Sequence, residues 1–159
     1  LVNGDCIGGG LELVLAADLV VAVPGARFGL PEPRVGLVAS GGLHRLTRYI
    51  GMKQAMEIAL TGRLFSAAEM KDFGVINHVA HDFAHARGKA LTWAQDIVKG
   101  APLAIAATKQ MMLSGLNHAS LRDAFSAAYP AFQRMLESED AQEGTQAFLV
   151  KRDPVWNGK

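Results

Sequence analysis

The chain of 159 residues lacks several features that would assign it to a specialised class of protein. It has a single cysteine, Cys6, so no internal disulfide can form, and we expect a reducing compartment such as the cytoplasm. The net charge is only +1 and no basic stripe is visible, so nucleic acid is not an expected partner. The longest apolar stretch, Leu13 to Val23, contains Asp18 and is too short to span a membrane.

The composition that remains is that of a folded protein. Hydrophobic residues make up 50% of the chain and charged residues 19%, which excludes extended disorder. The first half is rich in glycine and β-branched residues, whereas the second half has helical periodicity. We therefore expect an α/β core over residues 1–80 and a helical region over residues 81–159.

The order of elements follows from turn residues and caps. Strands are expected at residues 1–2, 19–23, 27–28 and 75–79, and a loop at Pro31-Glu32-Pro33. Ser66 and Glu69 form a capping-box pattern that starts a helix. Pro130 should kink or split a helix over 120–137. The remaining helices are expected at residues 11–17, 41–50, 51–60, 83–99, 102–114 and 139–151.

The glycine run Gly8-Gly9-Gly10 precedes a predicted helix. Glycines allow close approach of a ligand to the backbone, and the free N–H groups of a helix N-terminus favour a developing negative charge. The alternative is a tight turn without a ligand. The spacing matches neither a dinucleotide-binding nor a P-loop fingerprint.

Two glutamates, Glu12 and Glu32, each follow a turn that contains glycine or proline. Glu12 lies in the first turn of the predicted helix, where the helix dipole favours an ionised carboxylate. Glu32 lies between two prolines and after apolar residues, where a protonated acid is favoured. Such a pair is typical of a general base and a general acid. Taken singly, Glu12 could be a helix cap and Glu32 a loop residue bonded to the backbone.

These motifs, in this order, resemble the crotonase superfamily, which is the enoyl-CoA hydratase/isomerase family. The runs GGGLEL (8–13) and ARFGLPE (26–32) carry most of the resemblance. The others are 2–4, 17–18, 36–37, 41–42, 45–46, 60–62, 66–69, 74–76, the helix that contains Lys109, and 147–152.

The resemblance implies a spiral of β-β-α turns with C-terminal helices that assemble trimers or hexamers. It implies an acyl-CoA substrate, with no cofactor besides the CoA of the thioester and no metal. Gly9 would donate a backbone N–H to the thioester oxygen, while Glu12 and Glu32 would hold water and add it across the α,β double bond. Gly8, Gly10, Pro31 and Gly36 would contact the substrate. Phe148 and Lys151 would contact the CoA nucleotide; the alternative for both is a solvated helix end.

The sequence departs from the family pattern at two places. The N-terminal part, with the second oxyanion donor, is absent, so we expect upstream sequence to be missing. The segment 38–42 is about one residue shorter than the family loop. Two other functions therefore stay open, namely double-bond isomerisation and a non-catalytic subunit.

Three histidines, His78, His81 and His85, have a spacing that suggests a metal, but no carboxylate or cysteine cluster accompanies them. A solvated surface cluster is the preferred interpretation.

Overall fold

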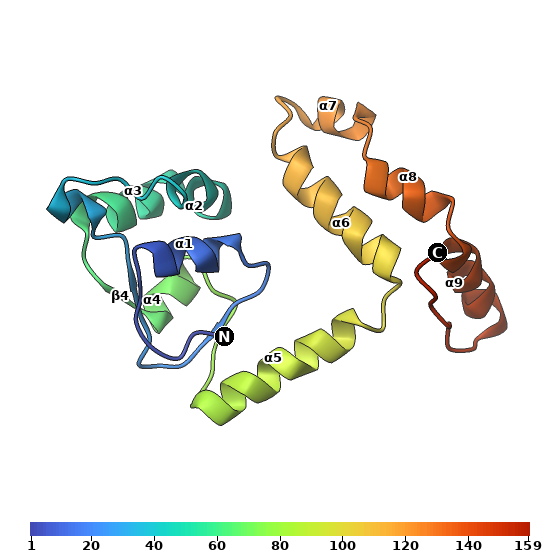
Figure 1. The fold of residues 1–159 in the computed structure, drawn as a ribbon, viewed down its shortest axis with the longest axis horizontal. Helices are drawn as coiled ribbons and strands as arrows, with labels where there is room; N and C mark the ends of the chain where they lie inside the picture. Colours follow the sequence, from blue (N-terminus) through green and yellow to red (C-terminus); the bar gives the residue numbers. More distant parts are fainter. The chain divides into compact units, whose positions relative to one another are not determined.

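The computed structural model describes all residues from 1 to 159. It divides into two compact units, an N-terminal unit of Leu1–Thr92 and a C-terminal unit of Trp93–Lys159. Strands and helices alternate in the first, and the second is helical (Figure 1). The predicted α/β class with a helical C-terminal region is confirmed.

The N-terminal unit contains two small sheets. The first has the strand order β1 (Cys6–Ile7), β3 (Arg27–Gly29) and β4 (Phe65–Ser66), with β1 parallel and β4 antiparallel to β3. The second pairs β2 (Val21–Ala22) with β5 (His78–Val79) in parallel. Strands β2 and β5 lie within the predicted ranges 19–23 and 75–79 but are shorter, and β3 extends the predicted 27–28 by one residue. Strands β1 and β4 were not predicted, and the strand expected at residues 1–2 is only an isolated bridge from Val2 to Ala22.

Four α-helices belong to this unit, namely α1 (Gly9–Ala16), α2 (Leu43–Tyr49), α3 (Met52–Thr61) and α4 (Ala67–Asp72). The capping box of α4 is present, with both reciprocal bonds between Ser66 and Glu69. One expectation was wrong: Glu32 is not in an irregular loop but begins a 3₁₀ helix, η1 (Glu32–Val35). Pro31 and Pro33 fix φ near the helical value, which favours this short turn.

The core of this unit fixes the segments that carry the two glutamates. Leu11 and Leu15 are four residues apart on one face of α1, and both are buried. Phe28 and Leu30, at and just beyond β3, are buried as well. Full burial of such a side chain is worth about 1.5–3 kcal/mol, so the neighbouring residues have little freedom to move. The largest fully buried side chains are Phe28, Phe65, Leu11, Leu15, Leu30, Leu46, Ile58 and Met70.

The C-terminal unit consists of helices joined by short turns. Helix α5 (Phe83–Ile97) begins in the N-terminal unit, and α6 (Pro102–Gly115), α7 (Leu121–Ser126), α8 (Pro130–Leu136) and α9 (Glu139–Val150) follow. Pro130 is the first residue of α8, and the predicted helix 120–137 is split into α7 and α8. None of the helices combines the length and apolar character needed to cross a membrane.

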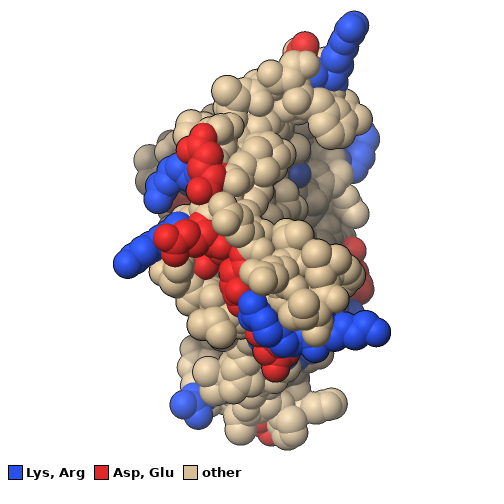
Figure 2. All heavy atoms as spheres, turned by 90° about the vertical axis from the view of Figure 1, so that its right-hand side faces the viewer, with Lys and Arg blue, Asp and Glu red and all other residues tan.

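Several apolar side chains of the C-terminal unit are exposed. Leu121 and Phe125 of α7 are more than 70% exposed, as are Phe148 and Leu149 of α9. One face of the molecule shows broad uncharged areas between its charged side chains (Figure 2). A surface of this kind is typical of a protein that binds another protein or a ligand.

The last residues of the chain fold back onto α9. The Asp140 carboxylate is only 2% exposed and accepts the N–H groups of Asn157 and Gly158, at 2.8 and 3.0 Å. Glu143 accepts two hydrogen bonds from the Arg152 guanidinium, at 2.5 and 2.7 Å, and one from the Val155 N–H at 2.8 Å. Two carboxylates of α9 therefore hold the C-terminal segment.

This arrangement predicts an acid-sensitive C-terminal segment. The hydrogen bonds from Arg152, and then that from Val155, lower the pKa of Glu143 from 4.5 to about 2. A lowered pKa means that the contact stabilises the folded state above pH 4.5 and that this contribution is lost as the pH falls toward 2. The fluorescence of Trp156 in a Trp93→Phe background reports the release of the segment. Glu143→Gln should flatten the acid dependence, and an unchanged profile in that variant would contradict the assignment.

Candidate active site

The two predicted catalytic turns lie side by side because β1 and β3 are parallel neighbours. Ile7 is paired with Gly29, and the Gly8 N–H continues the pairing to the Gly29 carbonyl at 2.9 Å. The chain leaves β1 through Gly8 into α1, and it leaves β3 through Leu30 and Pro31 into η1. Both turns are therefore at the carboxyl ends of parallel strands, which is where open α/β sheets bind ligands.

The Glu32 carboxylate lies directly against the Gly8 backbone. A Cβ placed on Gly8 would be 2.9 Å from Glu32 Oε1. The other oxygen, Oε2, is the one buried side-chain nitrogen or oxygen atom in the structure without a hydrogen-bond partner. A buried polar atom of this kind calls for an explanation, and a catalytic role is one of the few available. The position of Oε2 favours a carboxylate oxygen whose hydrogen-bond partner comes from a bound ligand.

Gly8 is predicted to be indispensable to this arrangement. Its φ of 57° and ψ of −124° are accessible to glycine and strained for other residues. We expect Gly8→Ala to cost about 1–3 kcal/mol of unfolding free energy from backbone strain and to displace the Glu32 carboxylate. Urea denaturation measures the loss. Gly4→Ala is the matched control, because a Cβ there has no atom within 4 Å; equal stability of the two variants would contradict the prediction.

The Glu12 carboxylate is held by the start of α2. Glu12 Oε1 accepts the Gly42 N–H at 2.9 Å. A Cβ on Gly41 would lie 3.2–3.3 Å from the carboxylate atoms of Glu12, so this approach requires a glycine there or a shift of the carboxylate. Gly41 and Gly42 were expected only to start a helix, and their contact with Glu12 was not predicted. Two glycines at the start of a helix were the available signal.

The N-terminus of α1 is the third part of the candidate site, beside the carboxylates of Glu12 and Glu32. Gly8 is the N-cap, Gly9 and Gly10 are the first helical residues, and no side chain caps this end. The first N–H groups of a helix have no partner within the helix and carry its positive dipole. A Cβ on Gly9 would meet no atom within 4 Å, so the space in front of it is open. This helix end can bind an oxyanion.

An apolar cavity of about 130 Å³ adjoins the Glu32 turn. Leu30 and Pro33, on either side of Glu32, contribute to its wall together with segment 38–39. A hydrocarbon group fits such a wall better than a polar one, because nothing in it offers a side-chain hydrogen bond. The lining residues are Leu30, Pro33, Val38, Ala39, Leu43, Ala59 and Leu60.

Two of the other predicted site residues flank the Glu32 turn, and two lie in the C-terminal unit. Pro31 caps η1, and Gly36 ends it in the left-handed conformation with φ 74°. Phe148 is 84% exposed on α9, and Lys151 follows α9 with φ 55°. Phe148 and Lys151 belong to the C-terminal unit, whereas both glutamates belong to the N-terminal unit.

Cys6 and the histidines contribute little to this site. Burial raises the pKa of the Cys6 thiol, which disfavours the nucleophilic thiolate. His44 is exposed on α2. No three or more His, Cys, Asp or Glu side chains are arranged to hold a metal ion.

Comparison with known proteins gives a consistent result. The family described as enoyl-CoA hydratase/isomerase matches residues 1–159. A mevalonyl-coenzyme A hydratase of Beauveria bassiana is 40% identical over 157 residues, which are 98% of this chain and 56% of that protein. A carnitinyl-CoA dehydratase of Salmonella paratyphi B is 42% identical over 165 residues, 99% of this chain and 62% of that protein.

Solved structures agree with these matches. The crystal structure of an enoyl-CoA hydratase from Mycobacterium tuberculosis H37Rv superposes with a TM-score of 0.89 at 38% identity, covering 98% of this chain and 62% of that one. The predicted crotonase fold is therefore confirmed. The chain spans about three fifths of the length of the relatives that it matches. Over its whole length, the chain belongs to the enoyl-CoA hydratase/isomerase family.

Proposed function

We propose that this chain carries the catalytic glutamates of an acyl-CoA hydratase, which adds water across the α,β double bond of an enoyl-CoA thioester or removes it in the reverse direction. The observation that carries the proposal is the placement of two carboxylates beside one uncapped helix N-terminus. One carboxylate, that of Glu32, has a buried oxygen without a partner. The other, that of Glu12, is oriented by the Gly42 N–H.

In this mechanism the ionised Glu12 takes a proton from a bound water as the water oxygen attacks the β carbon. The electron pair of the double bond moves toward the thioester carbonyl, whose oxygen gains enolate charge. The Gly9 N–H at the start of α1 stabilises that charge. The protonated Glu32 then delivers a proton to the α carbon. The sum is one water added, with Glu12 protonated and Glu32 ionised until they exchange protons with solvent.

The remaining roles are those that the family resemblance implies. Gly8, Gly10, Pro31 and Gly36 border the substrate, which brings CoA as part of the thioester and needs no further cofactor. Phe148 offers an aromatic face for the adenine and Lys151 an ammonium for phosphate. Lys151 is the left-handed C-cap of α9, with φ 55°, which fixes its backbone next to the last turn of that helix.

The exposed apolar side chains of the C-terminal unit would be covered in a homotrimer or hexamer. Leu121, Phe125 and Leu149 are among the most exposed. Burial of such side chains is the main favourable term in most protein associations.

The test is product analysis with two substrates. With crotonyl-CoA, a hydratase gives 3-hydroxybutyryl-CoA, and with a 3-enoyl-CoA it gives little conversion to the 2-enoyl isomer. Faster isomerisation than hydration would replace the proposal by a double-bond isomerase. Folded protein that acts on neither substrate would contradict both.

A further inference from the structure

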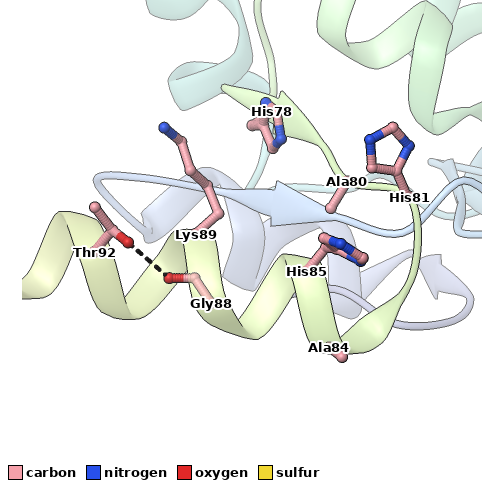
Figure 3. A pocket seen from close by; sticks show the side chains of 8 residues that line it. All are labelled: His78, Ala80, His81, Ala84, His85, Gly88, Lys89 and Thr92. Atoms are coloured by element: carbon pink, nitrogen blue, oxygen red, sulfur yellow. Dashed lines mark hydrogen bonds between the residues drawn. The ribbon is translucent and has the colours of Figure 1, made fainter.

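A second cavity, of about 560 Å³, lies in the N-terminal unit on residues that the proposed hydratase site does not use. Its volume is within the range of about 300–1,000 Å³ that is typical of pockets for small organic ligands. Its wall combines β5 and the segment after it with one face of α5 (Figure 3). Four side chains that can donate hydrogen bonds as cations contribute to it, those of His78, His81, His85 and Lys89.

The positions of these side chains follow from the elements that carry them. His85 and Lys89 are four residues apart in α5, so they project from the same side of that helix, and His81 lies in the segment just before it. The rings of His81 and His85 are 5.4 Å apart and nearly perpendicular. His78 reaches the same cavity from β5 (Figure 3).

Gly88 adds an independent observation. It lies inside α5, where glycine costs about 1 kcal/mol relative to alanine. A Cβ on Gly88 would meet no atom within 4 Å, so packing does not require a glycine there. Gly88 lines the cavity, and the missing side chain leaves room in it.

The charges decide which kind of ligand fits. The carboxylate next to the cavity, that of Asp82, accepts the His85 backbone N–H and pairs with His85 Nδ1, both at 2.9 Å. These bonds, the backbone one first, lower the pKa of Asp82. No acidic side chain lines the cavity itself. A metal cation would therefore meet the Lys89 ammonium without an available carboxylate, whereas an oxyanion can accept hydrogen bonds from Lys89 and from the imidazole N–H groups.

We propose that this cavity binds the phosphate groups of a small organic molecule, with His85 and Lys89 donating from α5, His81 from the segment before it and His78 from β5. Phosphate offers acceptor oxygens in several directions, which suits donors from two elements. Two sources offer such phosphates, the CoA of an acyl thioester and a separate phosphorylated metabolite.

Calorimetric titration of the 159-residue chain with pyrophosphate tests the proposal without any need for turnover. We expect saturable binding of one pyrophosphate. The double variant His81→Gln/His85→Gln and the single variant Lys89→Gln should each weaken it about tenfold or more, because the first removes two imidazole donors and the second an ammonium donor. His118→Gln in the C-terminal unit is the control and should bind as the wild type does. Thermal unfolding of every variant checks that it is folded.

A parallel titration with CoA separates the two sources. Weakened CoA binding in the same variants would assign the cavity to the CoA phosphates, and unchanged CoA binding beside weakened pyrophosphate binding would assign it to a separate metabolite. Absence of saturable pyrophosphate binding, or equal binding by wild type and folded variants, would overturn the proposal. Binding of Zn²⁺ without a response to pyrophosphate would overturn it as well.

Discussion

Replacement of Glu32 by glutamine is expected to lower the rate of crotonyl-CoA hydration by roughly 10²–10⁴-fold, the usual contribution of a positioned general acid or base. Glutamine keeps the shape of the side chain but has no proton to deliver to the α carbon. Its amide would still occupy the position beside Gly8. The measurement is the loss of enoyl-thioester absorbance at saturating substrate.

Two further variants make this result specific. Glu12→Gln should lower the hydration rate by a similar factor. Its amide oxygen can still accept the Gly42 N–H but cannot take a proton from water. Glu137→Gln, at an exposed position that ends α8, should leave the rate unchanged. Near wild-type hydration by either Glu12→Gln or Glu32→Gln would remove that glutamate from the catalytic assignment.

The second large effect is expected for Gly9→Pro. Gly9 is the first residue of α1, a position where proline is favoured because its ring presets φ and no intrahelical N–H bond is lost. The substitution therefore removes the proposed oxyanion donor, with the ring Cδ in place of its hydrogen, and keeps the hydrogen bonds of the helix. Loss of one such donor typically costs roughly 10²–10³-fold in kcat.

Gly9→Ala is the matched control for this experiment. It keeps the backbone N–H, and its Cβ would meet no atom within 4 Å, so activity should be retained. The pair of variants separates the N–H from the glycine itself. Equal loss in both would show that the space at Gly9 matters rather than its hydrogen bond, and retention in both would exclude Gly9 as a donor.

Much of the fold was predictable because its boundaries are set by local chemistry. Ser66 and Glu69 form the capping box that the sequence indicates, and Pro130 separates two helices. The tertiary features were not predictable in the same way. The strand predicted over 19–23 is reduced to Val21–Ala22, because its length depends on the partner strand rather than on its own residues.

In the candidate site, too, the local features were predictable and the long-range contacts were not. The motifs identify Glu12 and Glu32, but their adjacency depends on the pairing of Ile7 with Gly29, a long-range contact that no local pattern encodes. The hydrogen bond from Gly42 to Glu12 joins residues 30 positions apart and was missed for that reason. The folding back of the C-terminal segment onto Asp140 likewise depends on contacts between distant residues.

Incorporation of labelled oxygen tests most directly whether Glu12 and Glu32 act together to add water. The protein would be incubated with crotonyl-CoA in H₂¹⁸O, and the 3-hydroxybutyryl-CoA analysed by mass spectrometry. The proposed mechanism predicts ¹⁸O at the β carbon with the wild type and a loss of at least about 10²-fold in labelled product with Glu12→Gln or Glu32→Gln. Labelled product at the wild-type rate from folded Glu12→Gln or Glu32→Gln protein would contradict it.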